Sequence, residues 1–231
     1  MSTENEMHQH RKSPKKAYKG MAMEGAIANW YARNTKGDVR GFRQCADAVV
    51  ASLPPNARVL EVAPGPGYLA IEIAKRGDSS VAGLDISETF VRIAQGNARA
   101  EGLEIDFRHG NASAMPFADA SFDVIVCRAA FKNFSDPLGA LDEMFRVLAP
   151  GGRASIFDLR KDASMEEIGA EVAGMRLSPV NAWFTRLVFR TTLLKNAYAK
   201  DALERMVAES RFGSGEVRRD GIGFELRLEK P

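Results

Sequence analysis

The chain has 231 residues, with 32 Lys and Arg against 30 Asp and Glu and a formal net charge of +2. This near balance excludes a global electrostatic field of the kind that attracts nucleic acid or membranes. No run approaches the roughly 20 apolar residues that span a bilayer, so we expect no stable membrane insertion. The length suits one α/β domain with small appended elements.

The cysteine usage and the N-terminal sequence bear on the compartment. Cys45 and Cys127 are far apart in sequence and form no CxxC pair, so the spacing predicts no metal site and favours a reducing environment. The N-terminus is polar and then basic, without the apolar core of a signal peptide. We therefore expect a cytoplasmic protein.

The N-terminal region divides into a tail and a helical part. Residues 1–17 contain most of the basic run 8–19 and are predicted to be a disordered tail, with contact to phosphate or acidic lipid as the alternative. Residues 18–35 predict a helix, because Met23, Ile27, Trp30 and Tyr31 recur at helical spacing. A second helix is expected over 39–53 and ends before two prolines, so that 18–55 forms one helical segment.

Residues 56–160 alternate between short apolar runs and helical segments. Ser87 is placed to cap one helix, and Pro137 lies in the first turn of another, which is expected to end before the Pro150–Gly152 stop signal. Strand and helix alternation with crossovers of this length predicts a doubly wound parallel sheet. The expected strands are 58–63, 80–87, 103–110, 122–131 and 153–160, and the expected helices are 68–77, 88–102 and 136–149.

The alternation stops after residue 160. Residues 164–210 look helical throughout, and 161–211 is predicted to be a helical insertion that covers an acceptor site. Residues 212–231 predict two strands joined at Asp220 and Gly221. The expected fold class is therefore α/β, with a doubly wound, mostly parallel, seven-stranded sheet that closes with a C-terminal antiparallel hairpin.

The turn Ala63-Pro64-Gly65-Pro66-Gly67 follows the first strand of this alternation. Ligands of doubly wound sheets bind at the carboxyl ends of the strands, and Asp85 ends the next strand, where a carboxylate can accept hydrogen bonds from ribose hydroxyls. The glycine-containing turn together with Asp85 indicates an adenosine-containing ligand.

The two prolines distinguish between the ligand classes that this turn could hold. A dinucleotide needs backbone N–H groups around its diphosphate, whereas Pro64 and Pro66 each remove one donor and stiffen the loop. S-adenosylmethionine carries no phosphate, and Glu61, just before the turn, can face its ammonium group. The pattern favours S-adenosylmethionine over a dinucleotide.

Four stretches in order, 59–67, 83–87, 110–127 and 140–153, resemble the class I S-adenosylmethionine-dependent methyltransferases, in particular the small-molecule and quinone-biosynthesis subgroup. The resemblance covers roughly residues 56–160. It implies a seven-stranded Rossmann-like fold, S-adenosylmethionine as cofactor, and transfer of a methyl group to a small acceptor by direct in-line displacement.

The resemblance also implies roles for individual residues. Asp85 would bind the ribose, Ile86 would pack on the adenine, and Asn111, where the family usually has Asp, would accept from the adenine amino group. Cys127 would lie beside the sulfonium and the acceptor, although a buried, inert thiol is the alternative. The residues expected at the cofactor are Glu61, Ala63, Gly65, Gly67, Asp85, Ile86, Asn111, Ala112, Cys127 and Arg128.

Acceptor contacts are expected from three parts of the chain: the N-terminal segment as a lid, the segment after the fourth strand, and the end of the fifth strand. Each candidate has an alternative as an ordinary helix or loop residue, and no general base is predicted. The candidates are Tyr18, Met21, Trp30, Tyr31, Lys132, Asn133 and Asp158.

The apolar segment 181–194 forms no single amphipathic stripe, and covering the acceptor, forming a homodimer and touching lipid all remain open for it. It favours a hydrophobic or aromatic acceptor. A nucleic-acid or protein methyltransferase is disfavoured, because residues 127–131 carry no D/N-P-P-aromatic motif and the core has no basic patch interleaved with aromatics. A dinucleotide oxidoreductase and a non-methylating enzyme of the same fold are further alternatives.

Overall fold

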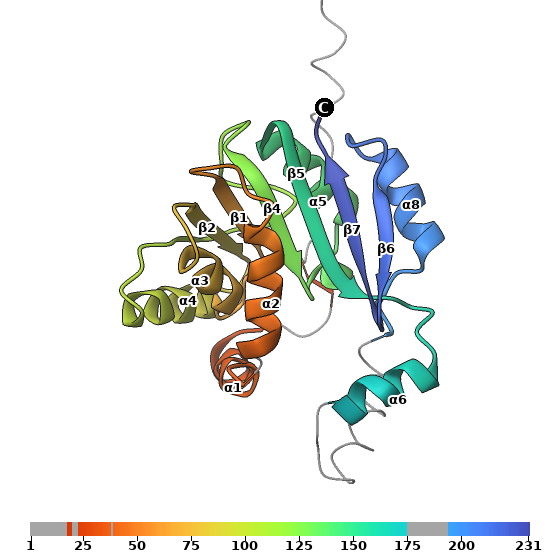
Figure 1. The fold of residues 1–231 in the computed structure, drawn as a ribbon, viewed down its shortest axis with the longest axis horizontal. Coiled ribbons are helices and arrows are strands. Elements are labelled where there is room, and N and C mark those ends of the chain that lie inside the picture. The colour runs from red at the N-terminus through yellow and green to blue at the C-terminus, as the bar shows by residue number, and fades with distance from the viewer. Residues whose placement is uncertain (1–17, 20–22, 38, 175–193) are drawn as a thin grey trace, which may run out of the picture.

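The computed structural model describes residues 18–19, 23–37, 39–174 and 194–231. The predicted tail, Met21 and all of the apolar segment 181–194 except Leu194 therefore lie outside the described residues. In the described part, helices cover both faces of one central sheet (Figure 1). None of the described helices is long and apolar enough to cross a membrane.

The sheet has seven strands in the order β3-β2-β1-β4-β5-β7-β6. The first five strands pair in parallel, and β7 is antiparallel to both β5 and β6. This confirms the predicted doubly wound sheet and its C-terminal hairpin. The strands are β1 (Arg58–Val62), β2 (Ser80–Asp85), β3 (Asp106–His109), β4 (Phe122–Arg128), β5 (Leu148–Leu159), β6 (Glu216–Asp220) and β7 (Gly223–Glu229).

Alternate residues of the central strands supply two separate cores. On β4, Ile125 and Cys127 pack on one face with α5 and α8, whereas Val124 and Val126 pack on the other face with α2, α3 and α4. Burial on both faces explains the nearly continuous apolar run of this strand. The helices are α1 (Gly25–Thr35), α2 (Val39–Val50), α3 (Tyr68–Ala74), α4 (Glu88–Ala100), the 3-10 turn η1 (Phe131–Asn133), α5 (Pro137–Val147), α6 (Met165–Gly174) and α8 (Lys200–Glu209).

Two helix starts follow their predicted signals. The Ser87 hydroxyl accepts a hydrogen bond from the Phe90 amide at 3.0 Å and caps α4. Pro137 is in the first turn of α5, and the Asp136 carboxylate accepts from the Gly139 amide at 2.9 Å. These side chains satisfy amide groups that the first turn of a helix leaves without a partner.

Two element boundaries were predicted wrongly. The first N-terminal helix begins at Gly25 rather than at residue 18, because Tyr18 instead pairs with Phe134 in an isolated antiparallel bridge. The stop signal at 150–152 lies inside β5, which begins at Leu148 and pairs with Phe122 before a register irregularity. Gly151 holds a positive φ of 74° there, so the glycine shapes the strand start instead of only ending the helix.

The region predicted to be helical over 164–210 is only partly so among its described residues. α6 and α8 are helical, but Tyr198 forms a parallel bridge with Arg160 and Lys161 donates to the Tyr198 carbonyl at 3.0 Å. Figure 1 shows α1 and α6 beyond the end of the sheet at which the parallel strands finish, and α8 beside β6. The carboxyl edge is therefore the part of the sheet that the chain flanks with extra helices.

The role of Asp136 as the N-cap of α5 can be tested by substitution. Asp136→Ala should lower the free energy of unfolding by about 1 kcal/mol, because the Gly139 amide loses its acceptor. Asp136→Asn keeps an oxygen in place and should lose less than half of that. Urea denaturation of both variants measures the difference, and equal losses would contradict the capping role.

Candidate functional site

The few amide groups of the loop between β1 and α3 already donate hydrogen bonds to other groups of the protein. The Ala63 amide donates to the Leu84 carbonyl at 2.8 Å, the Gly65 amide to Asp85 Oδ2 at 2.9 Å, and the Gly67 amide to the Pro64 carbonyl at 3.0 Å. Pro64 and Pro66 have no amide hydrogen to donate. The loop is therefore a poor diphosphate cradle for two reasons: it has few donors, and those it has are occupied.

The loop backbone is also held in an unusual conformation. Gly67 has a φ of 80°, and a Cβ there would lie 2.9 Å from Ala94 Cβ and from the Phe107 ring. Ala63 at the end of β1 and Ala129 after β4 have positive φ values of 58° and 59°, which non-glycine residues seldom adopt. Strained residues of this kind concentrate at functional sites, and these two lie on neighbouring strand ends.

Glu61 is buried at 3% exposure at the base of this loop. Its Oε2 accepts from the Ala70 amide at 2.8 Å and thereby caps the first turn of α3. Burial raises the pKa of the carboxyl to about 8, while the Ala70 hydrogen bond and the Arg128 charge act in the opposite direction. A carboxyl that is hard to ionise in the empty protein would gain from a cationic ligand group beside it.

Asp85, at 5% exposure, lies at the end of β2. Its Oδ2 accepts from Gly65 and its Oδ1 accepts from the Ser87 amide at 2.8 Å. Burial raises its pKa to about 6, and the two backbone hydrogen bonds limit the increase. Because a carboxylate can accept about four hydrogen bonds, roughly two sites remain for ligand hydroxyls.

The residues predicted to contact the adenine differ in whether their side chains are exposed or already hydrogen-bonded. Ile86 is 38% exposed, which is consistent with an apolar surface that a ring could cover. Asn111 Oδ1 already accepts from both the amide and the hydroxyl of Ser113, each at 3.0 Å. The Ser113 hydroxyl would therefore have to turn away before the predicted hydrogen bond from an adenine amino group could form. Ala112 packs partly buried against the core beside it.

Cys127 and Arg128 are on opposite faces of β4. Cys127 is fully buried in the core, and burial raises the pKa of its thiol well above the ordinary value, so this position is packed as an apolar residue. The Arg128 guanidinium lies over the Phe42 ring of α2 at 4.7 Å and on the side of Glu61. Phe42 in turn contacts the Tyr68 ring at 5.6 Å.

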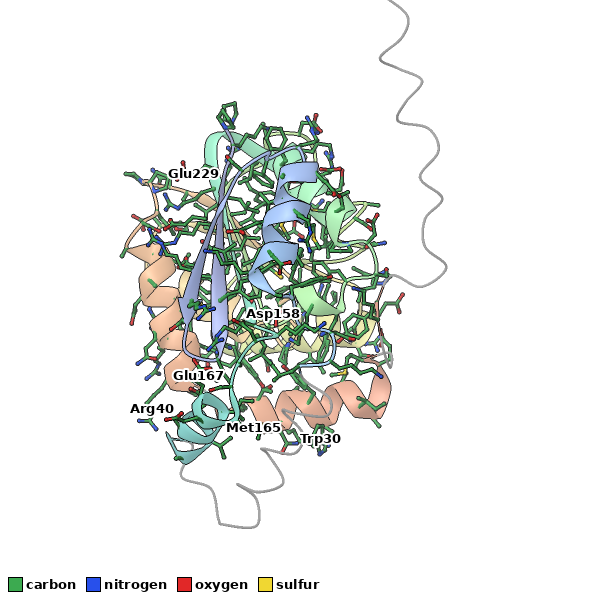
Figure 2. All side chains as sticks on the ribbon, turned by 90° about the vertical axis from the view of Figure 1, so that its right-hand side faces the viewer. Trp30, Arg40, Asp158, Met165, Glu167 and Glu229 are labelled. Carbon is green, nitrogen blue, oxygen red and sulfur yellow. The ribbon has the colours of Figure 1, made fainter. Side chains whose placement is uncertain are left out.

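Lys132 and Asp158, both predicted to face the acceptor, are paired with one another. Lys132 Nζ lies 2.7 Å from Asp158 Oδ1, and the Lys132 amide donates to Asp158 Oδ2 at 2.9 Å. Lys132 Nζ also donates to the Ala129 carbonyl at 3.0 Å. Figure 2 shows Asp158 in the interior of the molecule, and the pair fixes the strained turn after β4 to the end of β5.

Tyr18 lies across the carboxyl edge. Its segment pairs with 133–134, where the Lys19 amide donates to the Asn133 carbonyl at 2.7 Å. The pKa of the Tyr18 phenol is raised, first by burial and then by charges that include Asp85 and Asp158. The phenol is therefore close enough to interact electrostatically with Asp85 at the end of β2 and Asp158 near the end of β5, and it stays protonated at neutral pH.

Two residues of this edge were missed by the sequence analysis. Lys19 Nζ donates to the Tyr198 hydroxyl at 3.1 Å and lies 5.4 Å from the centre of its ring. Tyr198 also contacts the Phe131 ring at 5.8 Å. Lys19 was assigned to a basic run and Tyr198 to a helical insertion, and no spacing in the sequence links positions so far apart.

The first helix of the predicted lid is tied to the start of α4. The Glu24 carboxylate accepts from the Thr89 amide at 3.2 Å and from its hydroxyl at 2.5 Å, and Ser87 Oγ donates to the Met23 carbonyl at 2.6 Å. Tyr31 contacts the Phe90 ring at 5.8 Å, whereas Trp30 is 60% exposed. Of the two aromatic candidates on α1, only Tyr31 has a recorded ring contact with the core.

Comparison with known proteins agrees with this geometry. Residues 60–156 match the family model described as a methyltransferase domain. Demethylmenaquinone methyltransferases of Deinococcus radiodurans and Porphyromonas gingivalis are 40% and 36% identical over 126 and 151 residues, covering 54% and 62% of this chain and 52% and 61% of theirs. The chain thus spans about half the length of the first curated relatives it matches.

Solved structures show the same fold. A Methanococcus maripaludis protein, assigned provisionally to the S-adenosyl-L-methionine-dependent methyltransferases, superimposes with a TM-score of 0.72 at 22% identity, covering 95% of this chain and 97% of its own. The [4+2]-cyclase SpnF reaches a TM-score of 0.56 at 19% identity, covering 82% of this chain and 81% of its own. At these identities, the likeness shows the fold alone.

The seven-stranded sheet is the fold shared with these solved structures, and two buried carboxyl groups flank the loop at its carboxyl edge. Within the chain, the core 60–156 matches the methyltransferase domain model, and about half of the chain is similar to the demethylmenaquinone methyltransferases. Within the described residues, no group of three or more His, Cys, Asp or Glu side chains could hold a metal ion.

The Lys132–Asp158 pair generates a prediction about stability. Lys132→Met should destabilise the fold by about 3–5 kcal/mol, because it leaves a buried carboxylate without its cation. The double variant Lys132→Met with Asp158→Leu should recover a large part of that loss. Thermal and urea unfolding measure both, and a single variant as stable as the parent chain would contradict the structural role.

Proposed function

We propose that this chain transfers the methyl group of S-adenosylmethionine to a small hydrophobic or aromatic acceptor. The observation that carries the proposal is the arrangement around the loop, where Glu61 and Asp85 are buried beside a turn whose amides are already used. Such a site suits a ligand with a cationic end, ribose hydroxyls and no phosphate.

Each carboxyl group would meet a different part of the ligand. Glu61 Oε2 is held by Ala70, and Oε1 has no hydrogen-bond partner among the described residues, so it can face an ammonium group. The Asp85 carboxylate has acceptor capacity left for the ribose hydroxyls, and the exposed Ile86 next to it offers an apolar surface for the adenine. Gly65 and Gly67 form the wall between them.

When bound, S-adenosylmethionine supplies an electrophilic methyl group for direct displacement. The chain's own contribution is to hold an acceptor in line with that methyl and to exclude water, which can provide most of the rate enhancement. Tyr18, protonated and lying across the edge, can donate a hydrogen bond to the acceptor but is not poised as a base. Lys132 is occupied by Asp158 and does not act as a free base.

The names of the relatives direct the choice of acceptor. The demethylmenaquinone methyltransferases match about half of their own length, and their name specifies a quinone. Tyr198, which is half-buried against the Phe131 ring, offers an aromatic surface at this edge and supports an aromatic acceptor. We therefore infer a quinone-like ring as the acceptor class, in preference to nucleic acid, for which no basic patch was identified in the core sequence.

Purified chain incubated with S-adenosylmethionine labelled in the methyl group tests the proposal. Label should appear in a demethylated quinol and not in RNA or in bulk protein. Binding of S-adenosylhomocysteine without transfer to any of these acceptors would favour a non-methylating enzyme of the same fold, and tighter binding of NADH would exclude the assignment.

Removing the Asp85 side chain should weaken S-adenosylhomocysteine binding at least tenfold, because each charge-assisted hydrogen bond contributes about 1.5–3 kcal/mol. Calorimetry of Asp85→Ala and Asp85→Asn measures the loss. Asp106→Asn, at an exposed aspartate on β3 that pairs with Arg108, is the matched control. Unchanged affinity in both Asp85 variants would contradict the ribose contact.

The raised pKa of Glu61 predicts that the affinity for the cofactor depends on pH. With a folded pKa of about 8, the carboxyl in the empty protein is mostly protonated below neutrality, and a bound ammonium would favour its ionised form. Affinity for S-adenosylhomocysteine should therefore rise between pH 5.5 and 7.5, by at most about tenfold per pH unit. Calorimetry across this range should give a flatter profile for Glu61→Gln, and parallel profiles would refute the link.

The raised pKa of Glu61 also predicts how the stability of the fold changes with pH. Because the folded pKa of Glu61 is raised above its ordinary value of 4.5, its contribution is complete below pH 4.5 and is lost as pH rises through about 8. The empty protein should therefore lose stability relative to Glu61→Gln over that window. The difference in urea midpoint between pH 5 and pH 8 is the companion measurement.

A further inference from the structure

The helix α1 is arranged with its small side chains inward. Ala28 and Ala32 are buried against the body of the protein, whereas Ile27, Trp30 and Tyr31 are 38%, 60% and 36% exposed. Positions 27, 30 and 31 share one face of a helix, so these large apolar groups form a continuous stripe. A helix in water ordinarily buries such a stripe, whereas here Trp30 is largely exposed and Tyr31 is partly covered by the Phe90 ring of α4.

The stripe belongs to a larger apolar surface at one end of the molecule. The exposed large apolar side chains of the described residues all come from α1, the start of α2, the end of β2 and the start of α6. Figure 2 shows Trp30, Arg40 and Met165 at the same lower end, opposite Glu229. We define this carboxyl-end apolar surface as Ile27, Trp30, Tyr31, Val39, Ile86 and Met165.

Charge identifies which partner suits this surface. The described residues up to position 53 contain five Lys and Arg against two Asp and Glu, a net charge of +3. Arg33 at the end of α1, Lys36 just after it and Arg40 at the start of α2 are exposed, and no ion pair of theirs is found among the described residues. Glu166 and Glu171 on α6 are exposed acids, so the positive side of the surface is the α1–α2 side.

Apolar groups bordered by cations suit the surface of an anionic bilayer. An amphipathic helix lies in the interface with its apolar face among the lipids, and each Lys or Arg near the headgroups strengthens the attraction. A tryptophan is a preferred residue at this depth. A second copy of the chain would bring the same positive side against itself, which opposes association through this face.

We propose that the α1–α2 side of the carboxyl-end apolar surface binds peripherally to membranes that contain anionic phospholipid. The proposal rests on the proposed function for its consequence: Ile86, expected at the adenine, belongs to the same apolar surface, so a lipid-soluble acceptor could reach this edge of the sheet without crossing water. The contact is made on the surface, and no described helix spans a membrane.

Vesicle binding tests the proposal without any methyl transfer. The full chain is sedimented with vesicles of phosphatidylcholine alone or with about a third phosphatidylglycerol, at low and at high salt. We expect at least tenfold tighter binding to the anionic vesicles and a marked loss at high salt. Equal or absent binding to both vesicle types would overturn the proposal.

Two matched sets of variants locate the contact. Arg33→Glu with Arg40→Glu should weaken binding to anionic vesicles at least tenfold, whereas Lys200→Glu with Arg205→Glu, exposed on α8, should change it less than twofold. Ile27→Ser with Trp30→Ser should also weaken binding. Circular dichroism and S-adenosylhomocysteine binding show whether each variant is folded, and equal effects of the two charge reversals would refute the assigned face.

Fluorescence gives an independent readout of the same contact. The chain has two tryptophans, so Trp183→Phe leaves Trp30 as the sole reporter. Its emission should shift to shorter wavelength with anionic vesicles and stay unchanged with phosphatidylcholine alone. No shift, together with a concentration-dependent dimer that Trp30→Ser abolishes, would assign the surface to a second copy. Activity on a water-soluble quinol in the absence of vesicle binding would leave the methyltransferase proposal standing and this one rejected.

Discussion

The candidate site depends on two buried carboxyl groups that hold one loop. Asp85 accepts from Gly65 inside the turn, and Glu61 accepts from Ala70 just beyond it, so both ends of the turn are attached to neighbouring strand ends. Burial makes both groups reluctant to ionise, with the pKa of Glu61 raised to about 8 and that of Asp85 to about 6. A cationic group beside Glu61 and hydroxyl donors beside Asp85 would favour the ionised forms of these carboxyls.

The opposite side of the edge is organised by a different interaction. The Lys132–Asp158 pair attaches the strained turn at Ala129 to β5, and the paired segments at Tyr18 and Phe134 lie across it. These contacts use polar groups that could otherwise act on an acceptor. The chemistry left to the acceptor side is positioning by aromatic rings, which fits a displacement reaction that needs alignment more than proton transfer.

Peripheral attachment would connect these features to the outward apolar stripe of α1. The stripe is exposed because Glu24, Ser87 and Thr89 fasten the start of the helix to α4 with its alanines facing inward. A surface with this composition costs solubility unless it has an occupant. Binding of this surface to a bilayer, as proposed, would give that cost a function.

The sequence by itself determined the alternating strands and helices, the C-terminal hairpin and the loop with few donors, because each depends on local periodicity or on what proline and glycine allow. It did not determine the pairing of Lys132 with Asp158, the contact of Lys19 with Tyr198, or the start of α1 at Gly25. Those follow from residues brought together across the sheet, where the cost of burying a charge or of leaving an amide without a partner decides the outcome. Only the tertiary structure shows that Trp30 of α1 remains largely exposed while Ala28 and Ala32 are buried, since the helical spacing is the same whichever face is buried.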